Sequence, residues 1–388
     1  MLEIHRFDPS LCEFPRPGVP TLPVFQWSML GLGADAATRR VTDPAAGARF
    51  FSRGRYALHS AYRTAGVGPA GALLAPAYHC RTMIDPAIAL DGAVLLYRVN
   101  ADLTPDLDSV RALAATSPVA VKALLIPHYF GWEQPAPLMA DLQRFCRERD
   151  IALIEDCSHA WQVAAQRALA GKVDGGHMLI ASPYKFFSSA DGGMLWTSPA
   201  QPAGQGAGVK AELKALRAMW SGARNGVDAP PPAARPDPAA ISRGTDAVEP
   251  GKQPSSMYLR AEQGRSGLAS SRWVMRRTKV GQVVALRRAN YRRWLDAVAG
   301  LNGGRALFPD LPPACAPYMF PLYVERPDPD FFVLKKMGMP IFRWDEMAVS
   351  ACPVASRYRL SVFHLPCHQS LNEQQMDWMT TMLAEVLR

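Results

Sequence analysis

Two stretches decide how this chain folds: IALIEDCSHAWQ at residues 151–162 and GHMLIASPYKFFSSADGGMLWTS at residues 176–198. Each opens with an apolar run of strand length, and the runs end at Glu155-Asp156 and at Ser182-Pro183-Tyr184-Lys185. In parallel α/β sheets, ligands bind just beyond the carboxyl ends of the strands. We therefore expect an acid and a lysine, Asp156 and Lys185, to face one another across a bound cofactor. Pyridoxal phosphate requires that pair, because its aldehyde needs a lysine amine and its ring nitrogen needs a carboxylate.

The segments around these two stretches alternate between strand and helix patterns. Apolar runs at 72–75, 93–99 and 119–128 predict strands, and the periodic segments 103–115 and 135–150 predict helices. This alternation favours right-handed βαβ units and a mainly parallel sheet flanked by helices. The C-terminal part predicts a smaller α/β domain, with strands at 318–324 and 340–342 and helices at 331–337 and 372–387.

A glycine-led helix lies upstream of the acid and the lysine. Gly54 is followed by Arg55, Tyr56 and further residues at helical spacing. A helix N-terminus presents free backbone N–H groups and the positive end of the helix dipole, which suit a phosphate. We expect the Gly54–Tyr56 turn, with a charge-assisted contact from Arg55 and the hydroxyl of Ser182, to hold the phosphate of the cofactor.

Several motifs resemble the DegT/DnrJ/EryC1/StrS sugar aminotransferases, a group within the fold type I pyridoxal-phosphate enzymes. They are Ile154–Ala160, Ser182-x-x-Lys185, Asp191-Gly192-Gly193, the Arg-Arg-x-Asn-Tyr run at 287–291 and the Leu-Pro-x-His-x-x-Leu element at 365–371. The resemblance implies that Lys185 binds the cofactor covalently and shuttles a proton, with a pKa lowered toward neutrality, and that Asp156 pairs with the ring nitrogen. It also assigns His159 to the cofactor's 3-hydroxyl or to the face of Asp156. One of Tyr78, His79 and Cys80 contacts the ring, and the residues leave that choice open.

The resemblance further implies an aminotransferase that moves an amino group, by default from glutamate, to a keto-sugar carried on a nucleotide, in sugar or polysaccharide biosynthesis. It implies a homodimer in which each partner completes the other's active site. Phe186 after the lysine and Ile180 before it depart from the family pattern. A non-sugar carbonyl substrate, or a regulatory or binding role, therefore stays open as an alternative.

Composition changes along the chain divide it into five parts. We expect an N-terminal arm at 1–50, a cofactor-binding large domain at 51–198 and a Pro/Ala/Gly-rich insertion at 199–256. A connecting segment at 257–299, predicted as one long basic helix, and a small domain at 300–388 complete the chain.

Bulk properties fit an ordinary soluble protein. The 388 residues are 48% hydrophobic and 20% charged, with a net charge of +9. Seven dispersed cysteines, and a proline-punctuated start without a signal-peptide pattern, predict a cytoplasmic protein with reduced thiols. No apolar run is long enough to span a membrane.

Two readings from other functional classes are weaker. The arginine-rich segment 257–293 could bind nucleic acid, but only Tyr258, Trp273 and Tyr291 interleave aromatic rings there. A zinc site would need ligands drawn from His79, Cys80, His128, Cys157 and His159, which show neither HExxH nor CxxC spacing. We therefore expect no metal and no nucleic-acid partner.

Overall fold

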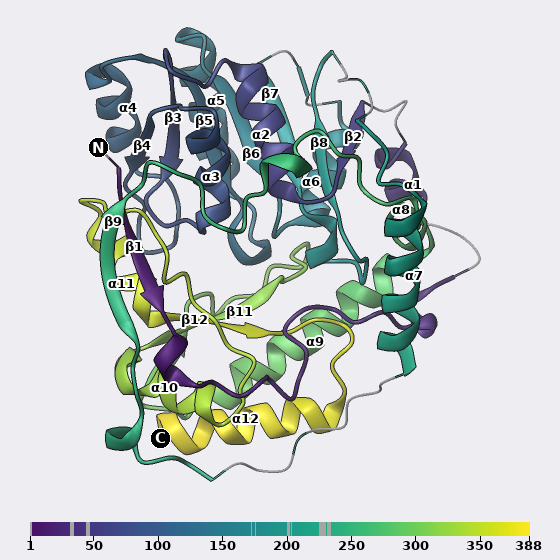
Figure 1. Cartoon of the computed structure of the whole chain (residues 1–388), viewed down its shortest axis with the longest axis vertical. Helices are drawn as coiled ribbons and strands as arrows, with labels where there is room; N and C mark the ends of the chain where they lie inside the picture. Colours follow the sequence, from purple (N-terminus) through teal and green to yellow (C-terminus); the bar gives the residue numbers. More distant parts are fainter. Residues whose placement is uncertain are drawn as a thin grey trace.

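The structure is a computed structural model that describes residues 2–31, 35–43, 47–171, 173–174, 176–199, 202, 204–224, 230 and 234–388. A seven-stranded sheet forms its upper half in Figure 1, with the strand order β2-β8-β7-β6-β5-β3-β4. These strands are β2 (Ala48–Phe51), β3 (Gly71–Pro76), β4 (Val94–Tyr97), β5 (Ala120–Pro127), β6 (Ala152–Asp156), β7 (His177–Ala181) and β8 (Gly193–Trp196). The five strands from β3 to β7 are mutually parallel, and β8 and β2 add antiparallel pairs at one edge.

The expected α/β architecture with a mainly parallel sheet is confirmed. Connecting helices are α2 (Gly54–Ala65), α3 (Arg81–Ala89), α4 (Leu107–Thr116), α5 (Ala136–Glu148) and α6 (Trp161–Leu169). Every residue of β3 and β7 is buried, as expected for strands covered on both faces. Because β3, β5, β6 and β7 run in one direction, their carboxyl ends meet at one edge, which is where the predicted site residues follow.

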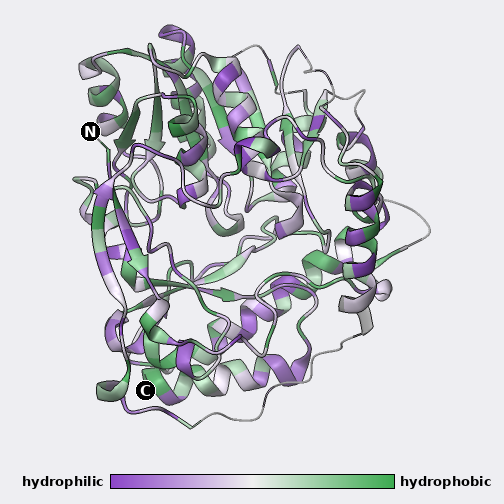
Figure 2. Ribbon diagram, in the orientation of Figure 1, coloured by the Kyte–Doolittle hydropathy of each residue, from purple (hydrophilic) through white to green (hydrophobic). Residues whose placement is uncertain are grey.

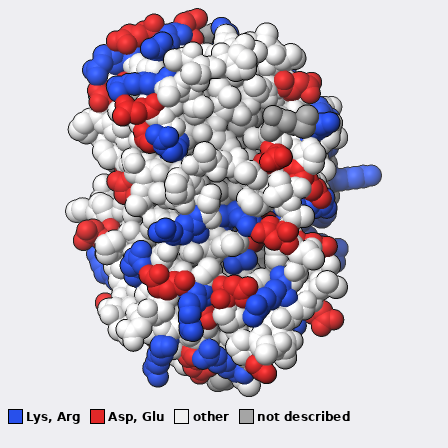
Figure 3. Space-filling model, turned by 90° about the vertical axis from the view of Figure 1, so that its left-hand side faces the viewer, with Lys and Arg blue, Asp and Glu red and all other residues white. Residues whose placement is uncertain are grey.

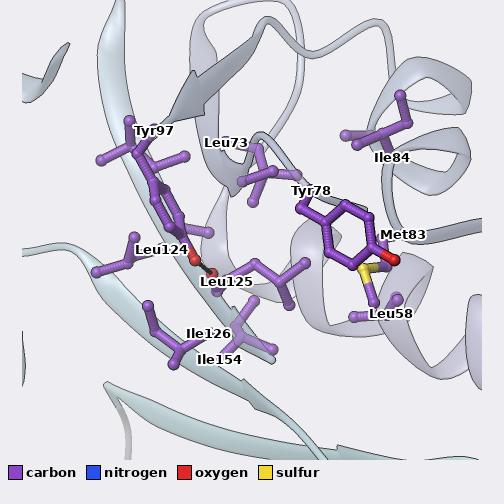
Figure 4. Packing of buried hydrophobic residues seen from close by; sticks show 14 of the residues in the cluster. Leu58, Leu73, Tyr78, Met83, Ile84, Tyr97, Leu124, Leu125, Ile126 and Ile154 are labelled. Atoms are coloured by element: carbon purple, nitrogen blue, oxygen red, sulfur yellow. Dashed lines mark hydrogen bonds between the residues drawn. The ribbon is translucent and has the colours of Figure 1, made fainter. Parts of the chain in front are cut away.

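The core under the parallel strands is a continuous apolar cluster. Figure 4 shows Leu73, Leu124, Leu125, Ile126 and Ile154 from neighbouring strands packed together, with side chains of α2 and α3 against them. Tyr97 is also fully buried, and its hydroxyl donates to the carbonyl of Leu125 at 2.8 Å. The phenol therefore joins the core without leaving a polar group unsatisfied.

A second, three-stranded antiparallel sheet forms the lower half of the molecule (Figure 1). Its strands are β10 (Gly304–Ala306), β11 (Met319–Val324) and β12 (Val362–Pro366), packed with α9 (Val280–Val298), α10 (Pro327–Lys336) and α12 (Glu373–Leu387); α11 (Pro353–Ser361) precedes β12. The strand predicted at 340–342 is wrong. Only Phe342 forms a β-bridge, to His364, because the two segments lie side by side over a single residue.

The single long helix predicted over 257–299 is also wrong. The segment contains a short turn and two helices, α8 (Ala269–Arg277) and α9, with Thr278 and Lys279 between them. Thr278 has an extended conformation, and the N–H of Lys279 bonds to the carbonyl of Met29 rather than to α8. Contact with the N-terminal segment therefore overrides the helical spacing at this point.

The N-terminal arm and the insertion pair with each other. Strand β1 (Glu3–Asp8) forms an antiparallel ribbon with β9 (Thr245–Pro250), at the left of Figure 1. The arm also contains helix α1 (Ala36–Val41), and the insertion contains helix α7 (Val209–Arg224). The irregular structure predicted for the Pro-rich stretches falls partly on residues 200–201, 203, 225–229 and 231–233, which lie outside the described residues.

Apolar and charged residues separate as in a water-exposed protein. Apolar residues line the sheets and the inner faces of the helices in Figure 2. Figure 3 shows Lys and Arg intermingled with Asp and Glu on the face that carries the β1–β9 ribbon, so the net positive charge is not gathered there. Among the described residues, no helix combines the length and the apolar character that a bilayer crossing requires.

Several histidines are buried near the junction of the two sheets. Burial lowers the pKa of His79 to about 4, and lowers those of His364 and His368 to about 3. The unfolded chain, with an ordinary histidine pKa of 6.5, therefore binds these protons more tightly than the folded chain does. The stability that neutral histidines contribute above that pKa is lost as the pH falls toward the folded-state values.

We predict that the free energy of unfolding decreases as the pH is lowered from 7 to 5. Each buried histidine contributes up to about 1.4 kcal/mol per pH unit to this decrease. His79→Asn keeps an acceptor for the N–H of Ala348 but removes one proton-binding group, so the loss between pH 6 and pH 5 shrinks by about 1 kcal/mol. Urea titrations at the two pH values measure it. An equal loss in the wild type and the variant would contradict the assignment.

Candidate active site

One pocket lies at the carboxyl edge of the large sheet, where the segments that follow β3, β6 and β7 meet the start of α2. Six of the residues predicted for the site line it: Gly54, Arg55, Cys80, Asp156, Ser182 and Lys185. The remaining lining residues are Arg53, Leu58, Thr82, Met83, Ser158 and Tyr184. Asp156 ends β6 and Lys185 follows β7, so the parallel pairing of these two strands brings the acid and the amine to the same pocket.

The first turn of α2 forms one end of the pocket. No side chain caps this helix, and the first backbone N–H with an acceptor in the helix is that of Tyr56, which bonds to the carbonyl of Arg53. The hydroxyls of Ser158 and Ser182 lie beside it, 2.9 Å apart. A Cβ added to Gly54 would lie 2.0 Å from the Ser182 hydroxyl, so a larger residue here would push that hydroxyl aside. Free N–H groups, two hydroxyls and Arg53 form a cradle for an anion.

The Asp191-Gly192-Gly193 motif holds that helix start in place. A Cβ on Gly193 would lie 2.3 Å from the carbonyl oxygen of Arg53 and 2.7 Å from the nitrogen of Gly54. Gly192 has a φ of 150° and donates its N–H to the carbonyl of Ser52. Asp191 accepts the N–H of Leu268 at 3.1 Å. The two glycines thus let β8 run directly against the start of α2.

Asp156 lies at the floor of the pocket and is only 2% exposed. Burial raises the pKa of its carboxyl group, while the hydrogen bond from the N–H of Ser158 at 2.8 Å and the charge of Lys185 favour the ionised form. A buried carboxylate is costly unless a cation pairs with it. Asp156 is therefore suited to pair with a protonated ring nitrogen.

Lys185 faces Tyr318, whose ring centroid lies 5.2 Å from the amine nitrogen. We expected burial and a phenolic neighbour to lower the pKa of this amine, and in the free protein that expectation is wrong. Burial alone lowers the pKa, but Tyr318, Tyr184, Cys80 and Asp156 outweigh it and place the pKa above its ordinary value. The prediction also counted on a nearby imine cation, which would lower the pKa of the amine by repulsion, and no such cation acts on the amine in the free protein.

Three predicted site residues place their side chains elsewhere. Tyr56 packs on Tyr258 and accepts the N–H of Leu259 with its hydroxyl at 3.2 Å, so only its backbone belongs to the cradle. His79 is fully buried and accepts the N–H of Ala348 at 3.1 Å, away from the pocket, because it fills the contact with the small domain. Tyr78 is buried too, and its hydroxyl contacts His364, so Cys80 alone of the three candidates lines the pocket.

His159 lies beside the pocket. Its ring stacks on Tyr318 with centroids 4.2 Å apart, and its Nδ1 accepts the N–H of Phe130 at 3.2 Å. Burial lowers its pKa well below the ordinary value, so the ring is neutral. Its contact with the cofactor's 3-hydroxyl stays a prediction.

The sequence analysis did not predict all of the residues that line or adjoin the pocket. Ser158 could have been found, because it follows the acid at a spacing of two and pairs with the predicted Ser182. Arg53 and Tyr184 are direct neighbours of predicted residues, and the guanidinium of Arg53 lies 4.7 Å from the Tyr184 ring centroid. Tyr318 carries no local signal, since it comes from the start of the small domain's sheet.

The candidate zinc ligands do not gather. Glu155, next to Asp156 in the chain, points to the other side of β6 and accepts from His128 at 2.8 Å and His177 at 2.6 Å. Among the described residues, no group of three or more His, Cys, Asp or Glu side chains is arranged so that it could hold a metal ion.

The chemistry of the residues that line the pocket suits pyridoxal phosphate. The cradle at Gly54, Ser158 and Ser182 suits the phosphate, and Asp156 suits the ring nitrogen. Lys185 lines the same pocket and carries the amine that the aldehyde requires. When bound, the cofactor would supply an electron sink for the carbanion chemistry of amino transfer.

We predict that Gly54→Ala weakens pyridoxal-phosphate binding by about tenfold or more, because the new methyl group displaces the Ser182 hydroxyl from the cradle. Gly281→Ala is the matched control, since a Cβ there has no heavy atom within 4 Å. Fluorescence titration with the cofactor measures both affinities. Unchanged affinity in Gly54→Ala, with wild-type stability, would contradict the placement of the phosphate.

Comparisons with known proteins agree with this geometry. Residues 48–203 match the model of the DegT/DnrJ/EryC1/StrS aminotransferase family. The comparison with curated proteins finds no match. Among solved structures, the aminotransferase TlmJ from Streptoalloteichus hindustanus is 20% identical with a TM-score of 0.61, and the match covers 94% of this chain and 98% of that chain.

Two further structures are similar over nearly the whole chain. A DegT DnrJ EryC1 StrS aminotransferase from Brucella abortus is 14% identical with a TM-score of 0.57, and the match covers 91% of each chain. The sugar aminotransferase CalS13 from Micromonospora echinospora is 16% identical with a TM-score of 0.55, over 94% of this chain and 99% of that one. These likenesses show the fold type I architecture. Residues 48–203 are in addition similar in sequence to the DegT/DnrJ/EryC1/StrS aminotransferase family, whose members are pyridoxal-phosphate-dependent enzymes.

Proposed function

We propose that this aminotransferase moves an amino group from an amino acid, with glutamate as the expected donor, to the carbonyl of a nucleotide-linked keto-sugar in sugar or polysaccharide biosynthesis. The observation that carries the proposal is that Lys185, Asp156 and the anion cradle of α2 share one pocket. This pocket provides a base, a carboxylate partner for the ring nitrogen and a phosphate anchor, which are the three groups that pyridoxal-phosphate amino transfer requires.

Each residue has a separate task in this proposal. The cradle residues would anchor the phosphate and hold the cofactor in the site independently of Lys185. Asp156 keeps the ring nitrogen protonated. The free amine of Lys185 would act as the base that takes the proton from the α-carbon of the amino-acid donor, which requires the amine to be neutral. Tyr318 covers one side of the amine.

The retained lysine favours catalysis over a regulatory or binding role. We test this with Lys185→Ala and Asp156→Asn. Wild-type protein incubated with pyridoxal phosphate and reduced with borohydride gains the mass of the cofactor on the peptide that carries Lys185. Lys185→Ala gains none. Asp156→Asn is still labelled but transfers amino groups at least about a hundredfold more slowly, because the ring nitrogen loses its counter-charge.

The donor assignment is tested separately. Single-turnover reactions with glutamate, glutamine and alanine each report conversion of the cofactor to its amino form. Glutamate is expected to react fastest.

In the borohydride experiment, labelling of wild type at another lysine, or labelling that survives in Lys185→Ala at the same peptide, would overturn the proposal.

We also propose a cytoplasmic homodimer in which each partner covers the other's pocket. Support comes from Met257 and Leu259, which are 44% and 57% exposed although the segment borders Arg55 of the pocket. Sedimentation is expected to show a dimer at micromolar concentration, and Leu259→Glu is expected to weaken it by placing a charge in the contact. A fully active monomer would contradict the proposal.

A further inference from the structure

Arg287 of α9 is a fully buried arginine that ends next to the lysine loop. Its Nη2 donates to the carbonyl of Lys185 at 2.9 Å and to that of Phe186 at 3.2 Å. Its Nη1 donates to the carbonyls of Pro317 and Tyr318 at 3.0 and 3.3 Å. Its Nε donates to the side-chain oxygen of Gln369 at 2.9 Å. One side chain thus holds three segments that are distant in the sequence.

None of these five acceptors is charged. Removing a guanidinium from water is costly when no carboxylate pairs with it. Burial accordingly lowers the pKa of Arg287 to about 10, which still leaves the group charged at neutral pH. An arginine retained under this penalty provides a planar fork of donors that a smaller side chain cannot reproduce. Arg287 therefore acts through the arrangement of its hydrogen-bond donors and not through an ion pair.

Gln369 reinforces the same connection. Its amide nitrogen donates to the carbonyl of Phe186 at 3.0 Å while its oxygen accepts from Arg287. Gln369 precedes α12 and Tyr318 precedes β11, so both belong to the part of the chain that carries the small sheet. Arg287 and Gln369 together tie the loop after β7 to that part of the chain.

The tied segments meet at the reactive amine. Lys185 is bound by Arg287 through its backbone, and its side-chain nitrogen lies 5.2 Å from the ring of Tyr318, whose backbone Arg287 also binds. The same Tyr318 ring stacks on His159. The positions of the amine and of the aromatic ring over it therefore depend on a common anchor.

We propose that Arg287, assisted by Gln369, is a positioning residue that sets the reach of the Lys185 amine toward the cofactor. The inference rests on the proposed function, because it concerns the same lysine. Arg287 touches the backbone of the lysine loop and leaves the anion cradle to other residues. Losing it should therefore slow covalent attachment of the cofactor while the phosphate still binds. A displacement of about 1 Å in a reacting group can reduce a rate by about a hundredfold.

The experiment separates positioning from phosphate binding. Pyridoxine 5′-phosphate, which has no aldehyde and cannot react with Lys185, reports affinity for the cradle. Pyridoxal phosphate at saturating concentration, quenched with borohydride at timed intervals, reports the rate of attachment to Lys185. For Arg287→Gln we expect an attachment rate at least about tenfold lower, with the affinity for pyridoxine 5′-phosphate within about twofold of wild type.

Two further variants define the role. Arg287→Lys restores a cation and one or two of the hydrogen bonds, so it should attach the cofactor faster than Arg287→Gln and more slowly than wild type. Arg288→Gln is the matched control. Arg288 is the next residue of α9 and also donates to backbone carbonyls, including that of Cys315 at 2.8 Å, but those carbonyls are outside the lysine loop. We expect wild-type attachment in this variant.

Gln369→Leu decides the question if Arg287→Gln does not fold. Leucine is similar in size to glutamine but makes neither of the two hydrogen bonds of Gln369. Attachment of the cofactor to Lys185 should therefore slow by about threefold or more. Wild-type attachment rates in the folded variants of Arg287 and Gln369 would overturn this inference but not the proposed function. Slowing in Arg288→Gln that equals the slowing in Arg287→Gln would do the same. A wild type that attaches no pyridoxal phosphate would overturn the proposed function and this inference with it.

Discussion

The buried carboxyl group of Asp156 is the constraint on which the site depends. It is placed at the carboxyl end of β6, with 2% of its surface exposed and with the charge of Lys185 nearby. An ionised carboxylate in such a position is costly without a cation beside it. The parallel pairing of β6 with β7 provides one, since the strand that neighbours Asp156 leads directly into the lysine loop. A protonated ring nitrogen between the two would offset the cost further.

The anion cradle at the start of α2 depends on close backbone packing rather than on charge alone. Gly193 lets β8 approach the first turn of α2, and Gly54 leaves room for the Ser182 hydroxyl. The N–H groups of that turn have no capping side chain. The same packing that completes the sheet edge therefore leaves donors available for an anion. The anion cradle and Lys185 are thus carried by different elements, β8 with α2 for the cradle and the loop after β7 for the lysine.

The sequence predicted the features that local pattern controls. Alternating apolar and periodic segments predicted the parallel sheet, and the ends of two apolar runs predicted Asp156, Ser182 and Lys185 in one pocket. What it could not predict arises from long-range contacts. The break between α8 and α9 comes from a contact with Met29, and His79 is drawn toward Ala348 of the small domain. Tyr318 and Arg287 reach the lysine across more than a hundred residues of chain, so no local spacing reveals them.

The structure of the protein with pyridoxal phosphate bound tests the central claim most directly, because it locates both ends of the cofactor at once. We expect the phosphate at the first turn of α2, in contact with Ser158 and Ser182, and the ring nitrogen within hydrogen-bonding distance of the Asp156 carboxylate. Continuous density should join the cofactor to the Lys185 amine. A cofactor bound with its ring nitrogen away from Asp156, or with its phosphate outside the α2 cradle, would contradict the account.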